Sequence, residues 1–418
     1  MTMRRWLLTI AICIVALPLG GQQTLSPAPG VPRLTIEDLL RWRIPSNPVL
    51  SPDGRRVAFL VTENDFEKSR VVAHLWWADV ESRQARRLTH VDDTVSSPRW
   101  SPDGRYLAFL STRGVAGDGR PRAQVWLLPV DGGEPLALTR TQRGVRHYRW
   151  APDGKAVYYV TDETVPTAVE KLRERRREQR LDAYTVDEEK LRREIWRVTV
   201  DGRRTERAFA GDLGLDSFEL SPDARWIVYR SNGTGDPDHS RRHDLWLLDV
   251  AAGRARQLVK REGAESSLAW SPDSARIAFL APRDPQINSS QDEVVVVPVA
   301  APAGAAQPEP QQVMKNFSGD IERLHWAKGD AIYFSAGVRT GNQLFRLNPA
   351  DGVARALTPD TAFLADAHWR NDDAVAIAEG PDALPDVVLV RSGLAGLETV
   401  KLTDLNPQLK TFALGAQE

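Results

Sequence analysis

Cysteine is almost absent from this 418-residue chain, which contains only Cys13. A single thiol excludes an intramolecular disulfide, so stability has to come from packing. An excess of charge of one sign is also lacking, because the formal net charge is −1. A balanced charge gives no basis for a nucleic acid or another polyanion as a partner.

Long hydrophobic runs are lacking except at the amino terminus, where Trp6 to Leu19 follow Arg4 and Arg5. This run is shorter than the ~20 residues that span a bilayer, which argues against the alternative of an uncleaved anchor helix. The pattern predicts a signal peptide over residues 1–21. Its removal takes away Cys13 and places the mature protein outside the cytoplasm, in the periplasm, without membrane attachment.

A catalytic serine motif is missing as well. No serine has a glycine both two residues before it and two residues after it, as the G-x-S-x-G nucleophile elbow of α/β-hydrolases requires. The histidines are scattered about one per repeat, in positions typical of structural or solvent-facing residues. These are His74, His90, His147, His325 and His368. We therefore expect no catalytic residue in the chain.

One pair of histidines raises the alternative of a zinc site. His239 and His243 are four residues apart, a spacing that brings both to one face of a helix. No glutamate follows His239, and Gly233, Gly235 and Pro237 predict a loop instead of a helix. We expect neither a metal site nor a cofactor.

The sequence does contain a long repeat. Five copies of a unit resembling WSPDGRYLAFLS begin at Ser51, Ser101, Ala151, Ser221 and Ser271. Two weaker copies are WAKGDAIYFSAG from Trp326 and WRNDDAVAIAEG from Trp369. A repeat of about 50 residues indicates a propeller or a solenoid.

Each unit is predicted to be all-β. Ser-Pro-Asp-Gly suits a tight turn, and strands rich in branched and aromatic residues follow it. Four antiparallel strands per unit make one propeller blade. We predict an all-β protein: a lead over 22–46 with a short helix at 35–43, a seven-bladed β-propeller over 47–403, and an exit segment over 404–418.

A tryptophan or leucine directly precedes each turn, at positions 50, 100, 150, 220, 270, 326 and 369. These side chains either form a stacking surface for ligands or pack between neighbouring blades. Repeat units need a large apolar residue where they stack, so we expect packing.

Two segments interrupt the period. The first, 162–193, is rich in charges of both signs and predicts a helical insert in blade three, with its helix over 169–181. No aromatic residues interleave with its basic ones, so it does not indicate nucleic-acid binding. The second, 299–312, is a Pro/Ala-rich loop.

The W-SPDG repeats, the strands of LWLLDV type, the Leu-Thr endings and the exit LTDLNPQL together resemble the prolyl oligopeptidase family of serine peptidases. That resemblance implies a propeller that gates and selects peptides for a following α/β-hydrolase domain with a Ser/Asp/His triad. The chain ends at Glu418, about where the hydrolase domain would start, so we expect it to be catalytically silent alone. The resemblance also implies a ring closed without strand exchange, with Thr399–Thr403 completing the last blade and its first and last blades free to part.

The dipeptidyl-peptidase branch of that family holds the substrate's amino terminus with paired glutamates on a propeller insert. Glu188 and Glu189 are paired acids in an insert, which makes them candidate substrate-binding residues. Their flanking residues do not match that branch, so a pair of surface charges is the favoured alternative. The whole repeat is also similar to TolB-type propellers, which leaves a second hypothesis: a stand-alone periplasmic propeller that binds a protein partner.

Overall fold

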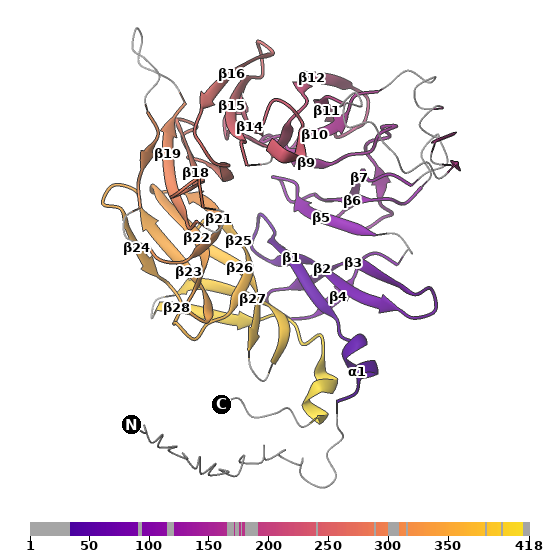
Figure 1. Ribbon diagram of the computed structural model, residues 1–418. Helices are drawn as coiled ribbons and strands as arrows, with labels where there is room; N and C mark the ends of the chain where they lie inside the picture. Colours follow the sequence, from indigo (N-terminus) through magenta and orange to yellow (C-terminus); the bar gives the residue numbers. More distant parts are fainter. Residues whose placement is uncertain are drawn as a thin grey trace, which may run out of the picture.

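The chain folds into seven four-stranded antiparallel sheets, which are arranged as the blades of a ring (Figure 1). The structure is a computed structural model, and it describes residues 34–90, 94–114, 121–164, 171, 175–176, 178–179, 191–239, 241–287, 290–299, 309–314, 317–380, 383–393 and 396–412. The all-β class, the number of blades and the number of strands per blade are as predicted.

The blades follow one another along the chain. Blade 1 consists of β1 (Ile44–Leu50), β2 (Arg56–Asp65), β3 (Arg70–Asp79) and β4 (Ala85–Arg87). Blade 2 consists of β5 (Val95–Trp100), β6 (Tyr106–Ser111), β7 (Gln124–Pro129) and β8 (Leu136–Ala137). Blade 3 consists of β9 (His147–Trp150), β10 (Ala156–Asp162), β11 (Arg193–Thr199) and β12 (Thr205–Asp212). Blade 4 consists of β13 (Leu215–Leu220), β14 (Trp226–Ser231), β15 (Asp244–Asp249) and β16 (Arg254–Val259).

The remaining three blades have the same order. Blade 5 consists of β17 (Ser266–Trp270), β18 (Arg276–Pro282), β19 (Asp292–Pro298) and β20 (Gln311–Gln312). Blade 6 consists of β21 (Asp320–Ala327), β22 (Ala331–Val338), β23 (Gly341–Asn348) and β24 (Val353–Ala356). Blade 7 consists of β25 (Leu364–Arg370), β26 (Asp373–Gly380), β27 (Ala383–Gly393) and β28 (Gly396–Lys401).

Among the described strands, no blade borrows a strand from another. Every sheet is built from four consecutive strands, and blade 7 takes its outer strand, β28, from its own sequence. Closure without strand exchange is therefore confirmed. The predicted outer strand, Thr399–Thr403, overlaps the end of β28 and runs two residues past it.

The core is divided among the junctions between blades. The buried apolar side chains of the described residues form seven clusters, each shared by two adjacent blades. The junction of blades 7 and 1 has one of these clusters, which includes Leu50, Phe59, Val375 and Leu389. The ring thus closes on hydrophobic contact, the main favourable term in such packing.

The repeated tryptophans lie in these junctions, as predicted. Trp100 and Trp150 are each 9 % exposed. The indole N–H of Trp100 donates to the carbonyl of Val49 at 3.0 Å, and that of Trp150 donates to the carbonyl of Arg99 at 3.3 Å. Trp270 makes the same bond to Glu219 at 3.2 Å. Each of these tryptophans therefore packs against the preceding blade and also hydrogen-bonds its innermost strand.

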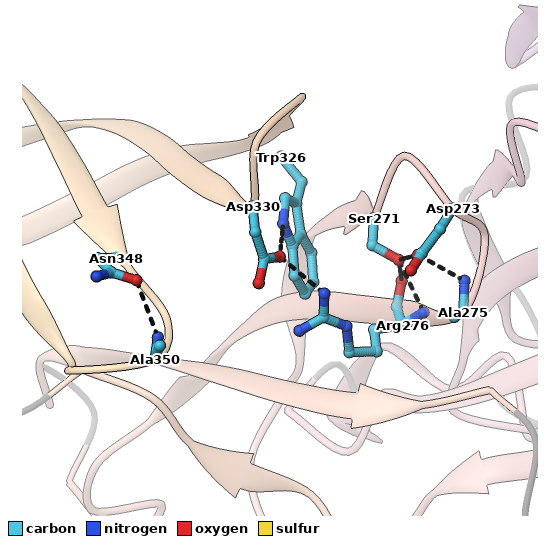
Figure 2. A network of polar contacts seen from close by, with 8 residues as sticks. All are labelled: Ser271, Asp273, Ala275, Arg276, Trp326, Asp330, Asn348 and Ala350. Atoms are coloured by element: carbon cyan, nitrogen blue, oxygen red, sulfur yellow. Dashed lines mark hydrogen bonds and ion pairs between the residues drawn. The ribbon is translucent and has the colours of Figure 1, made fainter.

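The Ser-Pro-Asp turn between the first two strands is held by side-chain hydrogen bonds (Figure 2). In blade 5 the hydroxyl of Ser271 donates to Asp273 at 2.5 Å and accepts from the amide of Arg276 at 2.8 Å. Asp273 also accepts from the amide of Ala275 at 3.0 Å. The hydrogen bond from Ser271 holds the pKa of Asp273 below its ordinary value.

Arg276, directly after this turn, contacts the next blade. Its guanidinium lies 2.7 Å from Asp330 and 4.7 Å from the centre of the Trp326 ring (Figure 2). The Trp326 indole also donates to Asp330, at 3.0 Å. The turn of blade 5 and the tryptophan of blade 6 therefore share one polar contact and one cation–π contact.

The predicted helix at 35–43 is shorter in the structure, where α1 covers Ile36–Leu40 with Thr35 as its N-cap. Its C-cap is Arg41, and beyond it the backbone N–H and C=O of Arg43 are bonded to the Asn406 side chain, at 2.9 and 2.8 Å. No helix of the described residues is long and apolar enough to cross a membrane. The predicted signal peptide lies outside the described residues.

Most of the predicted charged insert also lies outside the described residues. Within the predicted helix, four described residues have helical conformation: Lys171, Arg175, Arg176 and Glu178. The amide of Gln179 donates to the carbonyl of Arg175 at 3.0 Å, the spacing of one α-helical turn. The fragment agrees with the predicted helix over 169–181.

Candidate functional site in the central channel

A cavity of about 620 Å³ lies at the centre of the ring. Its walls come from the first strand of every blade, namely β1, β5, β9, β13, β17, β21 and β25. A site on these strands is held by seven separate sheets, which makes it a rigid place for binding residues.

Seven equivalent residues, one from each blade, line this channel. Each precedes the tryptophan or leucine that packs between blades. We call this set the collar: Val49, Arg99, Arg149, Glu219, Ala269, His325 and His368. The repeat thus brings residues that are 50 or more positions apart into one ring around the channel.

Bulges shape the strands that carry the collar. The pairing of the first strand with the second shifts register in blades 1, 2, 4, 5, 6 and 7. Within these bulges Asn47, Ser97, Ser267 and Asp366 adopt positive φ angles of 46° to 53°. Bulges bend a strand and redirect its side chains, and they are common beside functional sites.

Two collar charges are paired with each other. The guanidinium of Arg149 on β9 makes two hydrogen bonds to the carboxylate of Glu219 on β13, at 2.8 and 2.5 Å. Burial alone would lower the pKa of Arg149, but the charge and the hydrogen bonds of Glu219 outweigh it and raise that pKa. Arg149 therefore carries its positive charge at neutral pH.

Arg99 on β5 is the collar charge without a counterion. No hydrogen bond or ion pair joins its guanidinium to another described residue, and Glu219, which is paired with Arg149, acts on it only through its charge. Burial, together with the nearby positive charge of Arg149, lowers the pKa of Arg99 to about 10. Arg99 therefore still carries its charge at neutral pH.

The collar histidines are uncharged. Burial, reinforced by the positive charges of Arg99 and Arg323, lowers the pKa of His368 to about 3. Burial likewise lowers the pKa of His325 to about 4. With Arg149 and Glu219 cancelling, the collar has a net charge of +1, which lies on Arg99.

The remaining acids beside the channel are already bound. Asp366 accepts a hydrogen bond from the amide of Asn47 and lies 3.8 Å from Arg323. Glu322 accepts hydrogen bonds from Ser335 at 2.9 Å and from Asn342 at 2.7 Å. Neither carboxylate is therefore available to neutralise Arg99.

The described side chains of the channel offer charge and hydrogen bonds to a ligand. Ser335, one of two serines whose surroundings come nearest to a nucleophile elbow, is 1 % exposed and its hydroxyl donates to Glu322, so it is buried away from the channel surface. No group of three or more His, Cys, Asp or Glu residues that could hold a metal occurs in the described part of the chain. The channel offers a cation, two neutral imidazoles and backbone groups.

The residues proposed from the sequence are not the ones that form the channel. Glu188 and Glu189 lie outside the described residues. His239 ends a short 3₁₀ turn and its ring nitrogen contacts Thr234 at 3.0 Å, in the loop that the glycines predicted. The expectation that His325 and His368 are structural or solvent-facing missed their place in the channel wall, which the position before each repeated tryptophan could have revealed.

Comparisons with known proteins agree with the ring. Residues 43–190 match the model of the TolB beta propeller domain. Acylaminoacyl peptidase in complex with Z-Gly-Gly-Phe-chloromethyl ketone superposes with a TM-score of 0.65 at 14 % identity, over 88 % of this chain and 54 % of that one. The isolated β-propeller domain of the Trilobed protease from Pyrococcus furiosus, described as having an open Velcro topology, gives a TM-score of 0.62 at 14 % identity, over 88 % of this chain and 99 % of that one.

The chain has the fold of these peptidase propellers. In sequence, this propeller is 24 % identical over 163 residues to dipeptidyl-peptidase 5 from Porphyromonas gingivalis, covering 38 % of this chain and 23 % of that protein. It therefore spans about half of the solved acylaminoacyl peptidase and under a quarter of the dipeptidyl-peptidase.

Proposed function

We propose that this peptidase-type propeller admits and selects peptides for an α/β-hydrolase domain of a prolyl oligopeptidase family serine peptidase, in an exported, periplasmic protein. The observation that carries the proposal is the central channel, because all seven blades contribute a residue to its wall. An extended peptide would pass the collar before reaching a hydrolase domain at one mouth of the channel. The propeller itself would perform no chemistry.

The junction between blades 1 and 7 is the natural place for the ring to widen. None of the described strands crosses it, so side-chain packing and a few hydrogen bonds join its blades. One of these bonds joins Arg391 to the carbonyl of Gly54 at 3.2 Å. Parting these blades would admit larger peptides, as loop and domain openings do in other enzymes.

A photo-crosslinking peptide tests whether the channel admits substrates. An octapeptide with a benzophenone side chain is incubated with the purified chain, irradiated, and the labelled residues are mapped by mass spectrometry. Labels on the first strands of the blades, at residues such as Ser97, Ser217 and Ser267, are expected. Labels confined to the outer strands β4, β8 and β12 would refute passage through the channel.

The pairing with a hydrolase domain is tested at the gene. A reading frame beyond codon 418 that encodes G-x-S-x-G in an α/β-hydrolase supports it. An unrelated gene at that place opposes it. A fluorophosphonate probe should not label the purified propeller, and labelling would overturn the view that it lacks an active serine.

The second candidate is a stand-alone TolB-like periplasmic propeller that binds a protein partner. The match of residues 43–190 to the TolB propeller model favours it. This candidate predicts a stable complex with a periplasmic protein and no crosslinking of free peptides to the channel. The photo-crosslinking experiment therefore separates the two functions.

A further inference from the structure

We infer that Arg99 forms a binding site for a carboxylate group of the peptide that occupies the channel. This inference rests on the proposed function, because it assumes that peptides enter the ring. It adds the chemistry that the channel selects: a carboxyl terminus or an acidic side chain placed at the collar.

The backbone that presents Arg99 is held firmly from blade 3. The Trp150 indole donates to the carbonyl of Arg99 itself at 3.3 Å. The Tyr148 hydroxyl donates to the carbonyl of Ser97, two residues earlier, at 2.7 Å. Both bonds fix the bulge at Ser97, so the guanidinium is carried by a strand that does not need to rearrange when a ligand binds.

The positive charge of Arg99 is not neutralised by an ion pair within the described residues. Arg149 is neutralised by Glu219, whereas Arg99 has no such partner within the described ranges. A half-buried charge without a counterion is costly, and an entering anion removes that cost. Arg323, whose side chain is 54 % exposed and 3.8 Å from Asp366, adds positive charge beside the same channel.

The planar guanidinium favours a carboxylate, because its fork of N–H donors matches two carboxylate oxygens. Two ring nitrogens of the collar histidines add donors or acceptors that are not otherwise engaged. The Nδ1 atom of His368 and the Nε2 atom of His325 are buried and have no hydrogen-bond partner among the described residues.

Four short peptides test the inference. Ac-Ala-Ala-Ala-Ala with a free carboxyl terminus is compared with its amide, and Ac-Ala-Ala-Glu-Ala-amide is compared with its Gln counterpart, by isothermal titration into the wild-type chain. We expect at least one acidic peptide to bind roughly 10-fold or more tightly than its neutral counterpart, as charge-assisted bidentate hydrogen bonds allow. The pair that shows the preference identifies the carboxyl terminus or the acidic side chain as the ligand.

Variants of Arg99 test whether this side chain causes the preference for acidic peptides. Arg99→Gln should abolish it and Arg99→Lys should reduce it, because lysine keeps the charge and loses the fork. The control is Arg203→Gln, which makes the same change in charge at a side chain that is 86 % exposed on the rim; it should leave the preference unchanged. Because Arg99 has no ion pair to lose, the Arg99→Gln variant should have the same melting temperature as the wild type or a higher one. A clearly lower melting temperature would contradict the claim that Arg99 is unpaired.

The outcomes distinguish failure of the carboxylate site from failure of the proposed peptide channel. Acidic and neutral peptides that bind equally would overturn the carboxylate site while leaving a peptide channel. Peptides that do not bind at all would overturn both. Inorganic phosphate that competes as well as acetate does would make the site a general anion site and overturn its assignment to a carboxylate.

Discussion

At the scale of single residues, Glu265 departs from the pattern of the other blades. It lies six residues before the serine of the turn, a position that is apolar elsewhere: Pro45, Val95, Val145, Leu215, Ile321 and Leu364. Glu265 is fully buried, and neither of its carboxylate oxygens has a hydrogen-bond partner within the described ranges. Burial, reinforced by the charge of Asp244, raises the pKa of Glu265 to about 8.

Replacing Glu265 should therefore stabilise the protein at neutral and mildly alkaline pH. The unfolded carboxyl ionises near pH 4.5 and the folded one near pH 8, so the unfolded state binds fewer protons between these values. The free energy of unfolding then falls as the pH rises through that window. We expect Glu265→Leu to gain about 1–3 kcal/mol at pH 7.5 over wild type and less at pH 5, by urea unfolding.

Glu265→Gln is the matched control. It is neutral at every pH, so it should lose the pH dependence, but it still buries an amide without partners and should be less stable than Glu265→Leu. A Glu265→Leu variant whose gain does not change between pH 5 and 7.5 would contradict the ionisation argument.

Trp150 shows how one side chain joins two blades. Trp150→Ala should cost about 3–5 kcal/mol, because it removes a large buried ring from the junction of blades 2 and 3. Trp150→Phe keeps an aromatic ring and loses the hydrogen bond to Arg99, so it should cost clearly less. Thermal melts measure both, and an unchanged melting temperature of Trp150→Ala would be incompatible with its packing role.

At the scale of the element, the turn depends on a buried serine hydroxyl. Ser101 is fully buried, donates to Asp103 at 2.6 Å and accepts from the amide of Tyr106 at 2.9 Å. Gly104 follows with a φ of 74°, a conformation that glycine adopts without strain. Blade 3 has Ala151 at the serine position, so no hydroxyl is there to accept from Ala156.

The missing hydroxyl at Ala151 allows two opposite substitutions to be compared. Ser101→Ala should cost about 1–2 kcal/mol, since it leaves the amide of Tyr106 without its acceptor and removes one of the donors to Asp103. Ala151→Ser should gain up to about 1 kcal/mol by completing the same network in blade 3. Urea unfolding of both variants tests the turn, and changes of the same sign in the two would argue against it.

At the scale of the whole molecule, the two ends of the ring are joined by Asn406. This residue belongs to the exit segment LTDLNPQL, and its amide pairs with both backbone groups of Arg43, which lies 363 positions earlier. Leu402 and Leu405 of the same segment are buried in the cluster between blades 7 and 1. The exit segment thus fastens the closing junction, and Figure 1 shows it beside the start of β1.

Removing the hydrogen bonds of Asn406 to Arg43 should increase local opening of the ring at the junction of blades 7 and 1. Asn406→Ala should cost about 1–2 kcal/mol and increase hydrogen exchange in β1 more than in β13, which lies far from the junction. Asn406→Asp keeps the acceptor for the Arg43 amide and loses the donor to its carbonyl, so it should have an intermediate effect. Equal exchange increases in β1 and β13 would show that the junction has no special role in opening.

Much of the fold could be predicted from local patterns. The spacing of the turns defines the blades, because each Ser-Pro-Asp turn and its strand form within a dozen residues. The insert and the Glu188–Glu189 pair show the limit of this approach: paired acids in a sequence suggest a site, but only contacts with other segments make one. The channel residues were missed because each of them, taken alone, is an ordinary strand residue.

The sequence by itself determined seven units, their four antiparallel strands and the tryptophans that pack between them, since these depend on periodicity and on neighbours along the chain. Only the tertiary structure decided which charges cancel. Arg149 pairs with Glu219 across 70 positions, while Arg99 forms no ion pair within the described ranges and is affected by Glu219 only through its charge. Ring closure brings one residue from each blade to a common channel, and the distances between those residues depend on the packing of all seven blades.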